Sequence, residues 1–320
     1  MACLRKHPMN EAEIIQLQLV RIIGRKTTMP SMEVALVNGE RAAPAPGLKG
    51  ECPLCGKPAQ AKCGPIIRWH WAHAGRRHCD PWMENEGPWH RAWKSLFPSE
   101  WREVVDFDHT GEKHIADIKR PDGTVIELQN SPMSVEEMNS RETFYGERMI
   151  WIVNGEKFKD HIRIGDALPD PYHPKVRDFK LAMPVYAPWT NVWRQPCLDG
   201  GAFAYFRRSD IAAATSPRPM LELLHGKDFD GAVQESYRGQ HTWSWRKPRE
   251  GWLLSKRTVI FDLGESGMWA IGEYDQAPCL QRISRQALME SLLAGAAPDL
   301  TWSLDLYTDW MMPNTSLTTL

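Results

Sequence analysis

The sequence predicts an α/β protein with a helix, three strands, a helix and a strand in that chain order. Two strand-like segments, 113–119 and 124–129, flank Pro121-Asp122-Gly123, and a three-residue loop that ends in Gly suits a tight hairpin. Ser134 and Glu137 have the spacing of a capping box, which predicts a helix over 134–146.

The other elements of this core follow from apolar patterning. The continuous apolar run 149–153 is typical of a buried strand, and a crossover helix before it would set it parallel to the third strand. A first helix is predicted over 85–97, with Asn85 as its cap and Pro98 just beyond its end. A strand is predicted at 102–107.

Changes in composition divide the chain into four regions. A Pro-rich linker at 167–174 separates the core from a region with strand-like segments at 258–263 and 268–271 and a helix at 284–294. We therefore expect a C-terminal α+β region. The predicted regions are an N-terminal extension with helical spacing at 11–23 (1–32), a hairpin and Cys/His unit (33–82), the core (83–166) and the C-terminal region (175–320).

Composition bounds the class of protein. The 320 residues are 42% hydrophobic and 25% charged, as in ordinary globular proteins, and no apolar run is long enough for a membrane span. The N-terminus has no pattern of a secretion signal, and seven cysteines that include a Cys-x-x-Cys pair predict metal ligands in a reducing cytoplasm. With a net charge of −1, any contact with nucleic acid must depend on local basic patches.

A compact group of cysteines and histidines predicts a zinc site. Cys52-Pro-Leu-Cys55 is followed, after fourteen residues, by His70-Trp-Ala-His73. Two thiolates and two imidazoles form a closed tetrahedral set, so the Zn²⁺ would be structural, and its binding would stabilise a segment too small to hold a core. Alternative or additional ligands are Cys63, His78 and Cys79. Between Arg41 and Asp80, seven Lys/Arg against two acidic residues suit either phosphate contact or solubility.

An acidic pair on the hairpin predicts a second metal site. If the hairpin is centred on Asp122, Asp117 lies opposite Glu127, and facing Cβ atoms are about 5 Å apart. Two such carboxylates repel each other unless a positive charge lies between them, and a divalent cation would supply it. Glu127 and Gln129 project from one face of the third strand. The alternative is a half-exposed strand with a solvated Glu and Gln.

The first helix carries a polar stripe. Glu86, His90 and Lys94 are spaced i, i+4, i+8 and so share one face. Glu86 could reach a metal ion, and Lys94 could offset phosphate charge. A plain solvated face is the alternative.

These residues together resemble a known family. Cys-Pro-x-Cys with His-Trp-Ala-His, Glu86-x-x-x-His90-x-x-x-Lys94, His114-Ile-Ala-Asp117, Glu127-Leu-Gln129-x-Ser131, Arg141 and Tyr145 resemble the competence protein CoiA family over about half of the chain. That family is regarded as a branch of the PD-(D/E)xK nucleases. The resemblance implies that Asp117 and Glu127 bind the catalytic metal, that Glu86 is the acidic residue of the first helix, and that Gln129 replaces the usual Lys.

The function that this resemblance implies is Mg²⁺-dependent hydrolysis of DNA, with Mn²⁺ as an alternative ion. A metal-bound water would attack the phosphodiester, and Gln129, His90 or Lys94 would orient it or stabilise negative charge. We expect Ser131 and Arg141 to contact phosphate or to be structural. Beyond DNA, recombination or defence proteins are the expected partners.

A basic and aromatic segment lies in the C-terminal region. Residues 235–257 hold six Lys/Arg, two Glu and three Trp, and Arg246, Lys247 and Arg249 are expected to help hold DNA. The alternative is a hairpin with core tryptophans and a solvated basic face. Two other functions remain open: a DNA-binding or recombination-accessory protein with an inactive nuclease core, and a zinc-dependent interaction module.

Overall fold

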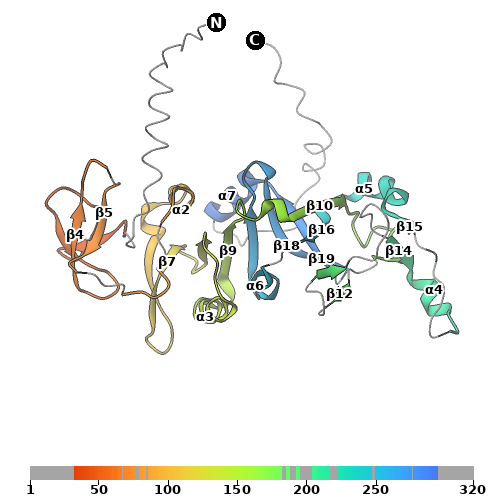
Figure 1. The fold of residues 1–320 in the computed structure, drawn as a ribbon, viewed down its shortest axis with the longest axis horizontal. Helices are drawn as coiled ribbons and strands as arrows, with labels where there is room; N and C mark the ends of the chain where they lie inside the picture. Colours follow the sequence, from red (N-terminus) through yellow and green to blue (C-terminus); the bar gives the residue numbers. More distant parts are fainter. Residues whose placement is uncertain are drawn as a thin grey trace, which may run out of the picture. The chain divides into compact units, whose positions relative to one another are not determined.

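The computed structural model has a mixed α/β fold with several sheets (Figure 1). It describes residues 32–294, apart from 67, 76–78, 84–85, 182–184, 188–191, 195–203, 217–221, 223, 247–248 and 276. The chain divides into two compact units, unit 1 (Met1–Ile126) and unit 2 (Glu127–Leu320). The helix predicted over 11–23, the cap Asn85, and the side chains of His78 and Lys247 lie outside the described residues.

Unit 1 begins with a five-stranded sheet in the order β2-β1-β3-β4-β5. The tight turn between the first two strands has positive φ at both central residues, Asn38 (54°) and Gly39 (84°), as a two-residue hairpin loop requires. Gly50 lies where a Cβ atom would meet the Leu36 carbonyl oxygen at 2.5 Å, so glycine lets these backbones approach. The strands are β1 (Ala35–Val37), β2 (Glu40–Ala42), β3 (Lys49–Glu51), β4 (Pro58–Lys62) and β5 (His70–His73).

The second part of unit 1 carries the first elements of the predicted core. The helix α2 (Pro88–Lys94) is shorter than the predicted 85–97, and its N-cap residue is Gly87. The strands predicted at 102–107 and 113–119 are confirmed as β6 (Arg102–Phe107) and β7 (Lys113–Lys119), which pair antiparallel. A single-turn 3₁₀ helix, Ser99–Trp101, precedes β6.

The predicted hairpin turn is also confirmed. Gly123 has φ 85°, and the Arg120 amide donates to the Thr124 carbonyl at 2.9 Å. The register pairs Lys119 with Val125 and Ile118 with Ile126, so the turn is centred on Asp122. The third strand, β8 (Val125–Gln129), contains the division between the two units.

Unit 2 continues the predicted element order. The helix α3 (Val135–Tyr145) begins after Ser134, whose hydroxyl accepts a hydrogen bond from the Glu137 amide at 3.1 Å. The strand β9 (Met149–Asn154) is buried along its whole length, as its apolar sequence predicts. It pairs in parallel with β17 (Thr258–Asp262), with Trp151 opposite Val259.

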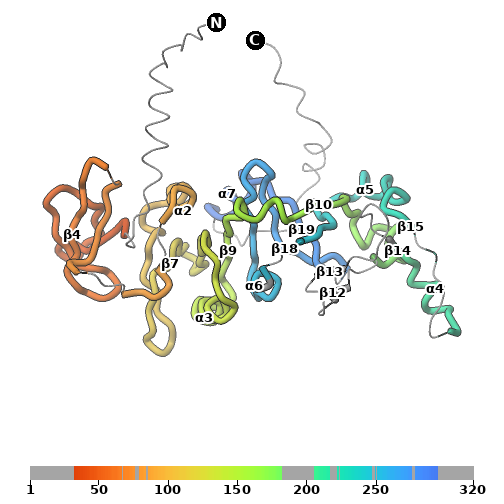
Figure 2. Tube along the Cα trace, in the orientation of Figure 1, coloured from red at the N-terminus to blue at the C-terminus, as the bar shows by residue number. Residues whose placement is uncertain are grey.

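The sheet of unit 2 has the order β10-β16-β19-β18-β17-β9-β8, and β9, β18 and β19 can be followed in Figures 1 and 2. Its core contains Trp151, Trp245, Trp252 and Phe261. The remaining strands are β10 (Ile162–Ala167), β16 (Gln240–Trp245), β18 (Met268–Tyr274) and β19 (Ala277–Ile283). The helix predicted over 284–294 is confirmed as α7 (Arg285–Ala294), and α6 (Glu250–Leu254) precedes β17.

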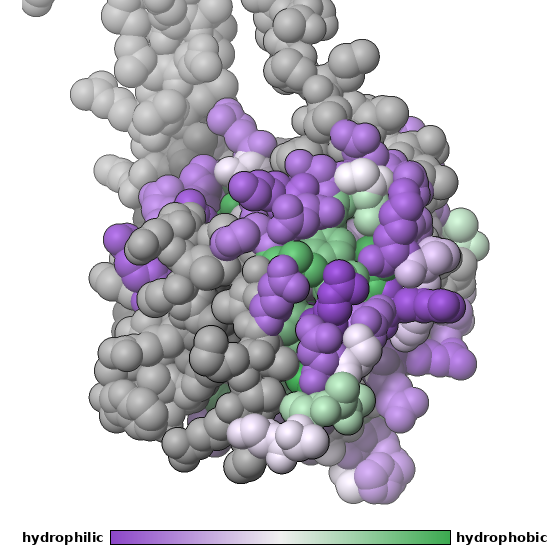
Figure 3. Space-filling model, turned by 90° about the vertical axis from the view of Figure 1, so that its right-hand side faces the viewer, coloured by the Kyte–Doolittle hydropathy of each residue, from purple (hydrophilic) through white to green (hydrophobic). Residues whose placement is uncertain are grey.

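A second, smaller core in unit 2 is built around Tyr205, Phe229 and Tyr274. The face drawn in Figure 3 is hydrophilic at its margins, and hydrophobic residues gather toward its middle. The elements near this core are β11 (Phe179–Leu181), β14 (Ala204–Arg207), α4 (Arg208–Ala213), β15 (Leu224–His225) and α5 (Asp230–Ser236), and β12 (Val185–Ala187) and β13 (Val192–Arg194) form a separate two-stranded sheet. The 3₁₀ turns of unit 2 lie at Gly146–Arg148, Lys159–His161, Gly226–Phe229 and Gly264–Ser266. None of the helices in the described part of the chain combines the length and apolar composition that a membrane span requires.

Candidate metal centres

The Cys52–Cys55 turn of unit 1 has the backbone of a metal-binding knuckle. The Gly56 amide donates to the Cys52 carbonyl at 2.9 Å, and Gly56 has φ 66°, a conformation that favours glycine. The Cys52 amide donates to the Lys57 carbonyl at 2.8 Å. These bonds turn the chain so that both thiols point to the same side.

Four side chains of unit 1 converge beside this turn: Cys52, Cys55, His73 and Cys79, whose donor atoms lie within 4.8 Å of one another. The Cys52 and Cys79 sulfurs are 3.6 Å apart, and Cys55 Sγ lies 3.4 Å from His73 Nε2. Ligands of a tetrahedral zinc ion would be about 3.7 Å (S to S) and about 3.5 Å (S to N) apart, given the usual bond lengths. The group could therefore hold a metal ion such as zinc.

Two of the three thiols in this group, Cys52 and Cys79, are disfavoured as thiolates, whereas the pKa of Cys55 is lowered because the effect of burial is outweighed by hydrogen bonds. Burial raises the pKa of Cys52, and burial together with the neighbouring Cys52 thiol raises the pKa of Cys79. A divalent cation among them would reverse this effect, because it stabilises thiolates.

The structure does not bring His70 into this group, and Cys79 lies there in its place. His70 and His73 are three residues apart on a strand, β5, so their side chains leave opposite faces. His73 pairs with Ala59 near the knuckle, whereas His70 pairs with Lys62 and its Nδ1 lies 2.8 Å from the Arg68 carbonyl oxygen. Two ligands spaced i, i+3 lie on the same face of a helix but on opposite faces of a strand. Cys63 is not among the four residues either.

The residue after Cys79 connects the knuckle to β7. Asp80 is buried, and its carboxylate lies 2.9 Å from His114 Nδ1 and accepts from the Ile115 amide at 2.9 Å. The Trp82 ring stacks on the His114 ring with centroids 3.3 Å apart. Burial opposes ionisation of both groups, but each stabilises the charge of the other, so the pKa of His114 is raised and that of Asp80 is lowered. We call Asp80, Trp82 and His114 the clamp.

A second group of potential metal ligands in unit 1 joins α2 to β7. Donor atoms of Glu86, His90 and Asp117 lie within 4.8 Å of one another, and His90 Nε2 is 2.9 Å from Asp117 Oδ1. Only 3% of His90 is exposed, and its Nδ1 has no hydrogen-bond partner among the described residues. Burial lowers the pKa of His90, but the Asp117 carboxylate outweighs burial and raises it. His90 and Lys94 of the predicted stripe thus face inward on α2, so the alternative of a solvated face is wrong, whereas Glu86 lies just before the N-cap Gly87 and is not on the helix.

Lys94 is buried among three carboxylates. Its Nζ contacts Glu86, lies 3.1 Å from Asp117 Oδ1 and lies 3.3 Å from Glu103 Oε1. Burial lowers its pKa, but the three carboxylates raise it well above the usual value. Lys94 is therefore a fixed ammonium, and we call Glu86, His90, Lys94, Glu103 and Asp117 the acidic cluster.

Sequence reasoning missed Glu103. The β6–β7 register pairs Arg102 with Ile118 and Val104 with Ala116, which puts Glu103 beside Asp117 on the neighbouring strand. Its φ is 48°, a left-handed conformation that is rare within a strand, and its Oε2 accepts the amides of Glu33 (2.8 Å) and Val34 (3.3 Å). Burial raises the pKa of Glu103 to about 7 against the opposing effect of Lys94. No pattern of spacing in the sequence marks this residue.

In unit 2, the predicted residues of β8 and α3 form their own buried contacts. Glu127 Oε2 accepts a hydrogen bond from Arg141 Nη1 at 3.1 Å, and Arg141 Nη2 donates to Glu137 at 2.5 Å. Gln129 Nε2 donates to the Ser131 carbonyl at 3.0 Å. All five residues of β8 are buried, so the alternative of a half-exposed strand is wrong.

The basic segment of unit 2 supplies core tryptophans. Trp245 and Trp252 are buried in the main core, and Trp243 packs partly against it. These indoles therefore do not offer a stacking surface for bases. Arg249 lies over the Phe158 ring, 4.6 Å from its centroid, and Arg246 Nη2 lies 3.2 Å from His161 Nδ1. The DNA-binding role of Arg246, Lys247 and Arg249 stays a prediction.

Comparisons of the chain with protein-family models, curated proteins and solved structures found no match.

Proposed function

We propose that the protein is a metal-dependent DNA nuclease of the PD-(D/E)xK type, similar to the CoiA family. Two observations support the proposal. The elements α2, β6, β7, β8, α3 and β9 follow the chain order of such a core. The residue before the N-cap of α2, the helix itself and β7 also bring Glu86, His90 and Asp117 together in a partly buried group that could hold a metal ion.

The charge of the acidic cluster is the observation that carries the proposal. The Glu86, Glu103 and Asp117 carboxylates share the single ammonium of Lys94. Burial raises the pKa of Glu103 to about 7, and despite burial the Asp117 carboxylate raises the pKa of His90, so protons help to neutralise the cluster when no metal ion is bound. A divalent cation would take the place of those protons and offset the carboxylate charge. A cluster on the solvated surface would not need a bound cation, because water would stabilise its charges. Lys94 and Glu103 are only 3% and 4% exposed, so water does not stabilise them in this way.

The donor set bears on the choice of ion. Two carboxylates suit Mg²⁺ and Mn²⁺, and an imidazole ligand favours Mn²⁺ of the two. Such an ion supplies an activated water and charge stabilisation when it is bound. In the proposal, Glu86, His90 and Asp117 hold the ion, Glu103 and Lys94 fix the Asp117 carboxylate, and the Lys94 ammonium offsets phosphate charge.

The sequence resemblance makes Glu127 a further carboxylate ligand and puts Gln129 in the position usually held by Lys. Arg141, whose Nη1 donates to Glu127 Oε2 at 3.1 Å, would orient that carboxylate. Zn²⁺ at the knuckle is structural, since four protein ligands leave no open position for a substrate.

The test is cleavage of supercoiled plasmid with Mg²⁺ or Mn²⁺. Asp117→Ala and Glu127→Ala should each abolish cutting, because each removes a proposed ligand. Glu100→Ala is a matched control, since Glu100 is an exposed carboxylate just before β6. Cutting that survives Asp117→Ala would overturn the proposal.

A second candidate function is a DNA-binding accessory protein with an inactive core. Asp117 is already paired with Lys94, and Glu127 is already paired with Arg141. Protein cations therefore already contact both carboxylates that the nuclease would need. Binding of DNA without cutting, under either metal, would favour this candidate.

A further inference from the structure

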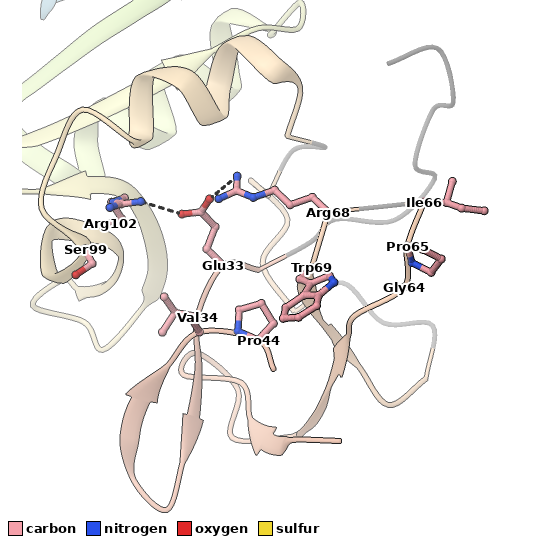
Figure 4. Close-up of a pocket in the computed structure, with 11 residues that line it drawn as sticks. Glu33, Val34, Pro44, Gly64, Pro65, Ile66, Arg68, Trp69, Ser99 and Arg102 are labelled. Atoms are coloured by element: carbon pink, nitrogen blue, oxygen red, sulfur yellow. Dashed lines mark ion pairs between the residues drawn. The ribbon is translucent and has the colours of Figure 1, made fainter. Parts of the chain in front are cut away.

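A groove of about 650 Å³ in unit 1 has no role in the proposed nuclease site. One wall comes from the residues just before β1 and the segment after β2, another from the loop before β5, and the third from the start of β6 and the turn before it (Figure 4). Its volume is in the range of sites that take one small ligand or one unit of a polymer. The lining side chains that carry the argument are Glu33, Pro44, Ile66, Arg68, Trp69 and Arg102.

An exposed indole lies in this groove. Trp69 is 48% exposed and Ile66 is 62% exposed, although unit 1 has a core of buried residues that includes Trp71. Figure 4 draws the Trp69 ring between Pro44 and the Arg68 side chain. A large aromatic ring that is left accessible inside a concave site marks a binding surface.

The charges of the groove favour an anionic ligand. The Glu33 carboxylate lies 3.0 Å from Arg68 Nη1 and 3.6 Å from Arg102 Nη1 (Figure 4). Two guanidinium groups thus share one carboxylate, which leaves an excess of one positive charge. The Arg68 side chain is 58% exposed, so its remaining donors can reach a ligand. Guanidinium groups match the geometry of phosphate oxygens.

The groove is connected to the acidic cluster by neighbouring residues in the chain and by a hydrogen bond. Arg102 directly precedes Glu103, and the Glu33 amide donates to Glu103 Oε2 at 2.8 Å. Glu103 in turn lies 3.3 Å from Lys94, which contacts Asp117. A strand bound in the groove would therefore lie next to the residues that the proposed function makes catalytic.

We infer that this groove binds an unpaired nucleotide of a DNA strand, with its base stacked on Trp69 and its phosphates against Arg68 and Arg102. That the bound strand is DNA to be cut by the protein rests on the proposed nuclease function. A duplex keeps its bases stacked on one another, so only an unpaired strand can offer a base face to the indole. The inference makes single-stranded or frayed DNA the preferred substrate.

The test is binding of a labelled oligothymidylate of about 12 nucleotides, a length typical of single-strand sites. The zinc-loaded full chain is used without added Mg²⁺ or Mn²⁺, and binding is followed by fluorescence anisotropy. Trp69→Ala should weaken binding roughly 5- to 100-fold, the range expected for loss of one stacked base, whereas Trp69→Phe should keep most of the affinity. Arg68→Ala should lower the salt dependence, the slope of log affinity against log salt, by about 0.7 for each phosphate that the variant no longer neutralises.

Tyr172→Ala is the matched control, because Tyr172 is an aromatic residue of unit 2 that is 87% exposed. Equal binding by Trp69→Ala and Tyr172→Ala would overturn the inference, as would tighter binding of the duplex or of oligouridylate. Because binding is measured without cleavage, the two proposals fail separately. If the protein binds DNA through Trp69 but never cuts it, only the proposed nuclease activity is contradicted. If the protein cuts DNA but binds it equally well without Trp69, only the proposed role of the groove is contradicted.

Discussion

The Lys94 ammonium lies 3.1 Å from Asp117 Oδ1 and 3.3 Å from Glu103 Oε1, so one buried cation joins carboxylates on two neighbouring strands. Glu103 is thus a neighbour of the Asp117 carboxylate that the sequence did not indicate. Lys94 supplies the positive charge that such a pair requires.

Lys94→Met should strongly destabilise the protein in the absence of added metal. The substitution leaves buried Glu103 and partly buried Glu86 and Asp117 without their cation, and breaking a buried ion pair typically costs about 3–5 kcal/mol. We expect the free energy of unfolding, measured with urea, to fall by about this amount and to recover in part when Mn²⁺ is added.

The control for this prediction is Lys113→Met. Lys113 begins the same strand as Asp117 but is exposed, so its replacement should change the free energy of unfolding by less than about 0.5 kcal/mol. Equal stability of the Lys94→Met and wild-type proteins without metal would contradict the role of Lys94.

Zinc binding should depend on Cys79 and not on His70. Cys79→Ser removes one of the four converging donors, whereas His70→Gln changes a side chain outside that group. Metal analysis of the purified protein should find zinc in wild type and in His70→Gln, and much less in Cys79→Ser. Loss of zinc from His70→Gln but not from Cys79→Ser would instead support the ligand set Cys52, Cys55, His70 and His73 that the sequence predicts.

Stability should fall in acid because of His241 in unit 2. Its Nε2 lies 2.6 Å from the Tyr237 hydroxyl, and burial lowers its pKa to about 4. The unfolded state, with an ordinary pKa of about 6.5, binds the proton first, so stability is complete above pH 6.5 and is lost as pH falls toward 4. The loss should be about 2 to 4 kcal/mol.

His241→Gln should remove this part of the pH dependence, because glutamine does not titrate. The difference in unfolding free energy between variant and wild type is measured from pH 7.5 to pH 4.5 and should shrink as pH falls. The exposed His109 provides the control, and His109→Gln should leave the profile unchanged. A difference that is constant with pH would rule out His241 as the titrating group.

Arg141 and Glu127 should be strongly coupled in unit 2. Arg141→Leu leaves the buried Glu127 carboxylate without its guanidinium partner and should cost about 3–5 kcal/mol. Adding Glu127→Gln should restore a large part of that loss, since the orphaned charge is gone. Additive effects of the two substitutions in urea unfolding would show that the pair is not coupled.

Much of the secondary structure could be predicted because local signals agree with the fold. The turn at Asp122–Gly123, the cap at Ser134 and the apolar strand β9 each depend on a few neighbouring residues. The extent of α2 was overestimated, because its capping residue is Gly87 and its last helical residue is Lys94.

The candidate sites depend on tertiary structure, which the spacing of residues in the sequence does not reveal. Two histidines three residues apart fit one ion only on a helix, and here they lie on β5. Cys79 belongs to neither the Cys-x-x-Cys nor the His-x-x-His motif, and Glu103 reaches Asp117 through strand pairing and a left-handed backbone. The burial of Trp245 and Trp252 likewise comes from tertiary packing, which a basic and aromatic composition does not reveal.

The clamp has a consequence for the stability of β7. Asp80 directly follows Cys79, one of the four converging donors. Its carboxylate accepts a hydrogen bond from the backbone amide of Ile115 on β7, two residues before Asp117. We therefore expect a metal ion at the knuckle to help anchor β7, so removing the ion should expose this strand to proteases in limited proteolysis.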